Sequence, residues 1–277
     1  MRLYKTKSGG LIETPGGLYR TRADWDSLVC SENLYERLQE ETGRPGVEKI
    51  GGPLPGDLLA PVGRQEVWAS GVTYWRSRSA RMEESRDSGG STFYDKVYEA
   101  ERPELFFKAA PYRVSGHGQP VRIRRDSHWN VPEPELTLLL SPSGRITAYT
   151  IGNDMSSRDI EGENPLYLPQ AKCYDGSCAL GPCLYVSPKP LPKTTEIHIE
   201  IRRGGQAAFS GSVAISQIKR TFGELASFLY REMSFPHGCL LMTGTGVVPP
   251  NDFTLKPGDE VHIQIEPIGT LVNRVEA

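Results

Sequence analysis

The sequence lacks the features that would assign it to several common protein classes. Its 277 residues include only five cysteines, an odd and sparse set that does not match a disulfide framework. Cys173, Cys178 and Cys183 recur at a regular spacing that does not match a zinc ribbon. We therefore expect buried free thiols. The formal net charge is only −2, so bulk electrostatics gives no argument for nucleic acid or an anionic membrane as a partner.

Long apolar segments are also missing. No run of residues is long enough to span a bilayer, which argues against a membrane protein. Residues 1–5 lack the apolar stretch of a signal peptide, so we expect a protein of the reducing cytoplasm. The chain is instead rich in glycine, with 29 residues, and in proline, with 22. This composition predicts many turns and short strands rather than a helical bundle.

Alternating apolar and polar residues predict a β-rich α+β fold with several antiparallel strands. Residues 136–140 and 146–151 flank a Ser-Pro-Ser-Gly turn and are expected to form a hairpin. Residues 196–202 alternate strictly, and we interpret His198 within them as an exposed strand residue. Thr221 precedes a glutamate by three residues, which is a capping box and predicts the start of a helix.

The Pro/Gly-rich stretch that ends near Gly63 indicates a boundary between two domains. Residues 1–64 are predicted to form a small N-terminal domain, and residues 65–277 a larger domain that carries the candidate site. Within the small domain we expect a helix over residues 31–42, with Ser31 as its N-cap.

Two glutamates, Glu133 and Glu135, flank Pro134, which favours an extended conformation for the residue before it. In a strand they share a face, where two carboxylates repel each other unless a positive charge lies between them. A divalent cation would supply that charge. Since the motif has no His or Cys, its oxygen ligands favour Mg²⁺, Mn²⁺ or Ca²⁺ over Zn²⁺. Pairing with arginines such as Arg124 or Arg125 is the alternative that this spacing leaves open.

Other candidate residues each have two interpretations. Asp154 follows a predicted strand, and it is either a turn residue or a further metal ligand. Lys172 lies among small and apolar residues, and it is either a base in a dry pocket or a surface lysine. Lys108 ends an apolar strand and either reaches solvent or recognises an anionic ligand. Arg78 and Arg81 belong to a solvated helix or clamp a substrate carboxylate.

Four motifs occur here in the order in which the fumarylacetoacetate hydrolase family has them. They are Glu133-x-Glu135, the run Gly152–Asp159, Lys172-x-x-Asp175 and Leu180-Gly181-Pro182. The turn Thr243–Gly246 fits that family's substrate-binding threonine turn. From about Gly71 to the C-terminus, the chain therefore resembles this family.

The resemblance implies a mixed β-roll core, a dimeric or tetrameric assembly and a small N-terminal domain of variable sequence. It also implies a Mg²⁺ ion held by Glu133, Glu135 and Asp154, with Lys172 in the active site.

One departure bears on the reaction. Hydrolases of the family carry a water-activating histidine where this chain has Ser77, and a serine cannot supply that general base alone. The runs 71–84, 102–108 and 157–165 look like a branch of the family that dehydrates 2-keto-3-deoxy sugar acids in pentose catabolism.

The expected function is therefore Mg²⁺-dependent dehydration of a 2-keto-3-deoxy sugar acid, with 2-dehydro-3-deoxy-D-arabinonate the expected substrate and 2,5-dioxopentanoate the product. Lys172 is the candidate base, and Glu84 and Glu161 are candidate acids. The residues expected to bind substrate are Tyr74, Ser77, Arg81, Lys108, Arg158 and Thr245. The alternatives are a hydrolase, decarboxylase or isomerase acting on a related 2-oxo acid, and a metal-binding protein without activity.

Overall fold

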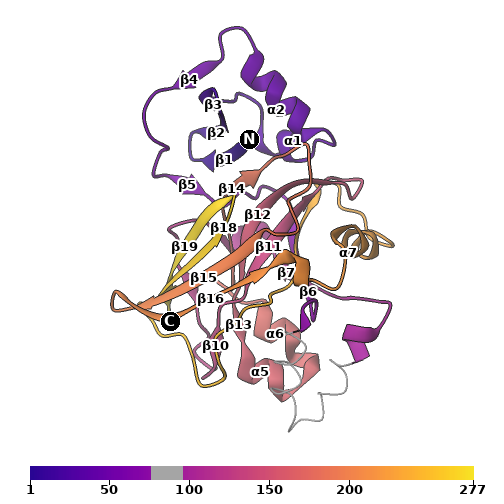
Figure 1. Cartoon of the computed structure of the whole chain (residues 1–277), viewed down its shortest axis with the longest axis vertical. Helices are drawn as coiled ribbons and strands as arrows, with labels where there is room; N and C mark the ends of the chain where they lie inside the picture. Colours follow the sequence, from indigo (N-terminus) through magenta and orange to yellow (C-terminus); the bar gives the residue numbers. More distant parts are fainter. Residues whose placement is uncertain (76–95) are drawn as a thin grey trace.

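The protein is described here by a computed structural model that covers residues 1–75 and 96–277. Two main sheets pack against each other in the body of the molecule (Figure 1). The larger runs in the order β4-β3-β2-β1-β14-β12-β11-β17-β6-β7, with β5 beside β1 and β8 beside β14. The smaller runs β16-β15-β18-β19-β9, and β10 pairs with β13. This is the β-rich α+β fold that the sequence predicts.

The strands of the larger sheet are β1 (Arg2–Thr6), β2 (Gly9–Thr14), β3 (Gly17–Arg20), β4 (Glu48–Ile50), β5 (Leu58–Leu59), β6 (Glu66–Gly71), β7 (Glu104–Ala109), β8 (Val114–Ser115), β11 (Pro134–Leu140), β12 (Ile146–Asp154), β14 (Cys178–Tyr185) and β17 (Cys239–Met242). The other strands are β9 (Val121–Arg122), β10 (Asn130–Val131), β13 (Ser156–Ser157), β15 (Glu196–Arg203), β16 (Gln206–Ala214), β18 (Glu260–Ile265) and β19 (Gly269–Glu276). The α-helices that lie wholly within the described residues are α1 (Trp25–Val29), α2 (Leu34–Gly43), α5 (Arg158–Glu163), α6 (Leu168–Lys172) and α7 (Phe222–Leu229). Single 3₁₀ turns occur at Pro111–Arg113, Pro165–Tyr167 and Ile215–Gln217.

Local sequence signals predict several of these elements correctly. Strands β11 and β12 form the expected hairpin, with Leu136 opposite Ile151. Helix α7 begins at the expected capping box, where the Thr221 hydroxyl accepts a hydrogen bond from the Glu224 backbone N–H at 3.1 Å. His198 lies on the polar face of β15, beside Glu196, as an exposed strand residue.

The predicted start of the first long helix is wrong. Helix α2 begins at Leu34 with Asn33 as its N-cap, not at Ser31. Residues 25–29 already form α1, and the Ser31 backbone N–H donates to the Leu28 carbonyl at the end of that helix. Ser31 therefore belongs to the connection between two helices. The solvated helix considered for Arg78 and Arg81 lies outside the described residues.

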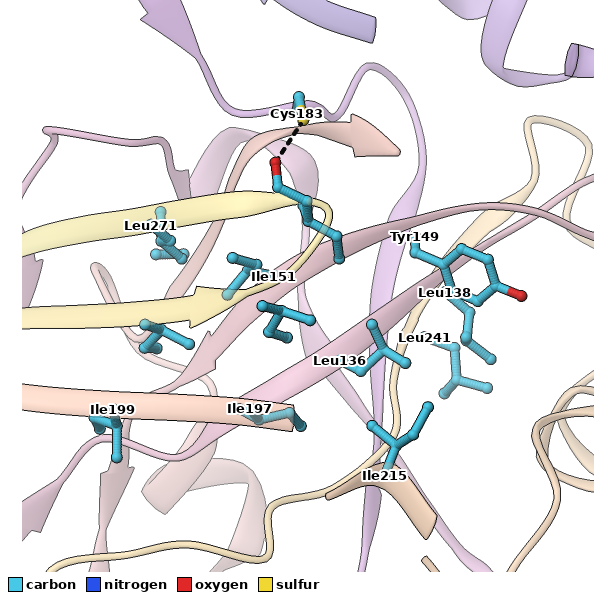
Figure 2. Packing of buried hydrophobic residues seen from close by; sticks show 14 of the residues in the cluster. Leu136, Leu138, Tyr149, Ile151, Cys183, Ile197, Ile199, Ile215, Leu241 and Leu271 are labelled. Atoms are coloured by element: carbon cyan, nitrogen blue, oxygen red, sulfur yellow. Dashed lines mark hydrogen bonds between the residues drawn. The ribbon is translucent and has the colours of Figure 1, made fainter. Parts of the chain in front are cut away.

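The interior between the two sheets is apolar (Figure 2). Leu136 and Ile151 point from the larger sheet towards Ile197 and Ile199 of the smaller one, and all four side chains are buried. Burial of each such side chain contributes about 1.5–3 kcal/mol to folding. All five cysteines are free thiols as expected, but only Cys178, Cys183 and Cys239 are buried, whereas Cys30 and Cys173 are half-buried. Cys183 donates to the Ile268 carbonyl at 3.4 Å.

The N-terminal segment continues the larger sheet. Strand β1 pairs antiparallel with β14, so that Arg2 lies opposite Tyr185. A second apolar cluster joins Leu3 and Leu28 of this segment to Leu184 of the larger part. The division into residues 1–64 and 65–277 stays a prediction. Among the helices of the described part, none is long and apolar enough to cross a membrane.

Truncation of the core residue Leu138 should measure the strength of the packing between the sheets. Leu138 is fully buried on β11, so Leu138→Ala is expected to lower the free energy of unfolding by about 2–5 kcal/mol. Leu166→Ala is the control, because Leu166 is 83% exposed and its truncation should cost less than about 0.5 kcal/mol. Urea unfolding followed by circular dichroism would measure both values, and equal losses would contradict the proposed core.

Candidate active site

Three carboxylates meet at one end of the larger sheet. Glu135 lies on β11 opposite Gly152 of β12, Glu133 immediately precedes β11, and Asp154 ends β12. One oxygen from each carboxylate lies within 4.8 Å of the others. All three side chains are almost inaccessible to solvent, and Asp154 is only 1% exposed. The i, i+2 spacing and the hairpin register together bring these groups to one place.

Cationic side chains surround this cluster. Lys172, the last residue of α6, contacts Glu133 Oε2 through its Nζ and lies 3.1 Å from Asp154 Oδ2. Arg158, the first residue of α5, places Nη2 at 2.9 Å from Glu133 Oε1. Arg124, one of the partners considered from the sequence, pairs with Asp126 instead. The short pairing of β10 with β13 brings Arg158 and Glu133 together, since Arg158 directly follows β13.

Lys108 lies beneath the cluster and is fully buried. Its Nζ is 2.5 Å from Asp154 Oδ1, and it donates to the Met155 carbonyl at 3.0 Å and the Lys172 carbonyl at 2.6 Å. An ammonium group has three donors, so these contacts use all of them. Lys108 therefore ties Asp154 to the end of α6.

The electrostatics differ between the carboxylates. Burial raises the pKa of Glu135 well above its ordinary value, and repulsion from Asp154 and Glu133 raises it further. Burial also disfavours the charged form of Asp154, but Lys108 and Lys172 hold the pKa of Asp154 below its ordinary value. Glu135 is thus the member of the cluster that most needs an added positive charge.

The residues present fit a divalent cation that prefers oxygen ligands. The cavity at the cluster has a volume of about 10 Å³, room for one particle of the size of a water molecule. Its described lining residues are Ser70, Gly71, Val72, Phe106, Glu133, Glu135, Asp154, Arg158, Lys172 and Thr245. Three carboxylates without His or Cys favour Mg²⁺, Mn²⁺ or Ca²⁺.

The turn after β17 holds Glu135 in place. The Gly244 backbone N–H donates to Glu135 Oε2 at 2.6 Å. Gly244 has φ +93°, and a Cβ there would lie 2.0 Å from the Thr73 hydroxyl oxygen, so only glycine fits. Thr73 in turn donates to the Thr243 carbonyl at 2.8 Å. Val72, which lines the cavity, has φ 52°, an unusual and strained conformation for a β-branched residue.

The predicted site residues take different places. Lys172, Arg158 and Thr245 line the cavity with the three carboxylates. The Thr245 hydroxyl donates to the Val247 carbonyl at 3.1 Å, which leaves its oxygen to accept a hydrogen bond from a ligand. Burial, with a smaller contribution from the Glu135 charge, raises the pKa of Tyr74, so its phenol stays protonated beside the cluster.

Other predicted site residues are not among the described lining of the cavity. Lys108 is one of them, because its Nζ contacts Asp154 and two backbone carbonyls, and Glu161 is another. Glu161 is buried one turn after Arg158 on α5, and its Oε2 accepts a hydrogen bond from the Ser156 hydroxyl at 2.9 Å. Ser77, Arg81 and Glu84 lie outside the described residues.

Sequence reasoning missed three contributors to the site. Phe106 lies in an apolar strand and was indistinguishable from a core residue, yet its ring lines the cavity, 5.8 Å from Lys172 Nζ. Nothing in the sequence indicates the left-handed conformation of Val72, because β-branched residues disfavour it. Gly244 lies in a Thr-Gly-Thr-Gly run that indicates a turn, but not its hydrogen bond to Glu135.

Known proteins resemble this chain over most of its length. Residues 75–276 match the family model described as "Fumarylacetoacetate (FAA) hydrolase C-terminal". The chain is 45% identical to the 2-dehydro-3-deoxy-D-arabinonate dehydratase of Saccharolobus solfataricus, over 79% of this chain and 74% of the relative. It is 48% identical to a probable 2-keto-3-deoxyxylonate dehydratase of Haloferax volcanii, over 78% of this chain and 73% of the relative.

A solved structure is similar over the whole chain. It is that of a 2-keto-3-deoxy-D-arabinonate dehydratase complexed with magnesium and 2,5-dioxopentanoate. The alignment has a TM-score of 0.86 at 35% sequence identity and covers 100% of this chain and 99% of that one.

Replacement of Gly244 should disturb the carboxylate cluster selectively. Gly244→Ala is expected to weaken Mn²⁺ binding about 10-fold or more, because the new Cβ displaces the turn that holds Glu135. Gly258→Ala is a matched control, since Gly258 also has φ +93° but has no atom within 4 Å of an added Cβ. Both changes strain the backbone, and only Gly244→Ala should change the affinity measured by Mn²⁺ electron paramagnetic resonance. Equal affinities in the two variants would contradict the role of Gly244.

Proposed function

Because the chain belongs to the fumarylacetoacetate hydrolase family, we propose that it is a Mg²⁺-dependent dehydratase of a 2-keto-3-deoxypentonate. The expected substrate is 2-dehydro-3-deoxy-D-arabinonate, and the products are 2,5-dioxopentanoate and water. The observation that carries the proposal is the similarity to two dehydratases of such acids over more than three quarters of the chain. The buried carboxylates and Lys172 supply groups suited to this chemistry.

Glu133, Glu135 and Asp154 would hold the Mg²⁺ ion. Bound there, it would act as a Lewis acid towards the oxygens of the 2-oxo acid group of the substrate. Arg158 keeps Glu133 oriented through the contact with its Oε1, and Gly244 does the same for Glu135. The protein thus positions the ligands before the substrate arrives, which avoids reorganisation during the reaction.

Lys172 is the proposed base. Its side chain lies in the cavity beside the cluster, and in its neutral amine form it would accept a proton from C3 of the substrate. The C4 hydroxyl then leaves as water, and loss of a C5 proton with return of a proton to C3 gives an enol. Tautomerisation of this enol, with a proton added at C4 and one lost from the C5 hydroxyl, gives the aldehyde of 2,5-dioxopentanoate. Glu84 and Glu161 are the proposed acids. The Ser156 hydroxyl donates a hydrogen bond to the buried Glu161 carboxylate and so holds it in position.

The proposed substrate contacts fall into two groups. Thr245 can accept a hydrogen bond and Tyr74 can donate one, so both suit the hydroxyl and carboxylate oxygens of a sugar acid. Ser77 and Arg81 are further proposed contacts. Lys108 uses its donors on Asp154 and two backbone carbonyls, and this supports a role in orienting Asp154 in place of direct contact with the substrate.

We further propose a homodimer or homotetramer in the cytoplasm, acting on a small 2-oxo acid and not on nucleic acid or membrane. The net charge of −2 supports the exclusion of nucleic acid. Large apolar side chains on the surface support self-association, since Tyr112 is 77% exposed and Trp75 is 62% exposed. Light scattering at several protein concentrations would measure the assembly.

Turnover of 2-keto-3-deoxy-D-arabinonate tests the proposed reaction. With Mg²⁺ the wild type should convert it to a single product 18 mass units lighter, the mass of water, and excess chelator should abolish the conversion. Glu135→Gln should lower kcat/KM about 100-fold or more, because it removes one charged ligand from the cluster. Glu232→Gln, at an exposed position, should leave kcat/KM unchanged.

Mass spectrometry separates the alternatives. A hydrolase would release two fragments from an acylpyruvate, a decarboxylase would release carbon dioxide, and an isomerase would leave the mass unchanged. If the wild type leaves the pentonate untouched and cleaves acylpyruvates, dehydration is not its reaction.

A further inference from the structure

Lys172 lies where a metal ion held by the same carboxylates would lie. Its Nζ contacts Glu133 Oε2 and is 3.1 Å from Asp154 Oδ2, which makes it a cation bridging two of the three clustered carboxylates. Lys172 Nζ therefore occupies the space between Glu133 and Asp154 that an ion bound to both carboxylates would need.

Geometry and charge both oppose simultaneous binding. A Mg²⁺ ion takes carboxylate oxygens at about 2.0–2.1 Å, whereas an ammonium group takes them at about 2.7–2.9 Å. An ion between Glu133 and Asp154 would therefore lie almost on the present position of Nζ. The ammonium group and the metal ion would be two cations very close together in a buried site, where they repel each other strongly.

We propose that the Lys172 ammonium and the divalent cation compete for the position between Glu133 and Asp154. Binding of the cation displaces the Lys172 side chain within the cavity, towards the bound acid. This inference rests on the proposed function only for the presence of that acid. The competition itself follows from the contacts of Lys172.

The two buried lysines differ in the groups that hold their ammonium nitrogens. Lys108 also contacts Asp154, but two backbone carbonyls hold its Nζ and it is not among the described residues that line the cavity. Among the described residues, the hydrogen-bond partners of Lys172 Nζ are carboxylates, and the centroid of the Phe106 ring lies 5.8 Å away. The structure therefore assigns Lys108 as a fixed positioning residue and Lys172 as the cation that moves.

Mn²⁺ binding to the purified protein tests the competition. If the ammonium occupies the position nine-tenths of the time, it weakens the apparent affinity about tenfold. Lys172→Met and Lys172→Gln should therefore bind Mn²⁺ about tenfold more tightly than the wild type in an electron paramagnetic resonance titration. Lys108→Met is the matched control, because it also removes a buried ammonium beside Asp154. We expect it to bind Mn²⁺ no more tightly than the wild type, since Asp154 loses its orientation.

The outcomes are distinct. Unchanged or weaker Mn²⁺ binding in both Lys172 variants would overturn the proposal, as would equal tightening in Lys108→Met. A Lys172 variant that is unfolded in chelator but folds when Mn²⁺ is added supports it, because the ion then replaces the ammonium. A variant that stays unfolded at saturating Mn²⁺ contradicts it. None of these readouts depends on turnover, so failure of the wild type to dehydrate a pentonate would refute the proposed function and leave the competition intact.

Discussion

The mutual repulsion of three buried carboxylates is the constraint on which the site depends. Glu133, Glu135 and Asp154 are held within a few ångströms of one another in a place that water barely reaches. Such a cluster is stable only with positive charge beside it. Lys172 and Lys108 supply part of that charge, together with Arg158 at Glu133. The candidate catalytic groups therefore also bear on the stability of the fold, because each carries charge that the cluster has to balance.

Much of the fold follows from local signals, and the remainder depends on contacts between distant residues. The turn after Leu140 and the capping box at Thr221 act over a few residues, so the sequence predicts both elements. Local signals do not predict the start of α2. Ser31 is a residue type that favours the N-cap position, but it lies in the connection between α1 and α2. The pairing of β1 with β14 joins residues more than 180 positions apart, and no local pattern indicates it.

The site shows the same division. The i, i+2 spacing of Glu133 and Glu135 indicates a shared face, and the hairpin register explains why Asp154 joins them. The sequence does not separate the two lysines, since each simply follows apolar or small residues. Their partners in the described part of the chain separate them, because two backbone carbonyls hold Lys108 whereas carboxylates hold Lys172. The resemblance of the chain to the family indicates which residues belong to the site more readily than it indicates what each residue does.

The pairing of β1 with β14 also bears on how the chain can be shortened. Strand β14 packs between β12 and β1, so β1 covers backbone groups that would otherwise form an open edge. An open edge next to the buried Leu184 would be a template for pairing with another molecule. Strand β1 thus protects this edge of the sheet from pairing with another molecule. Any shorter version of the protein would need a charged or proline-bearing replacement for that strand to stay monodisperse.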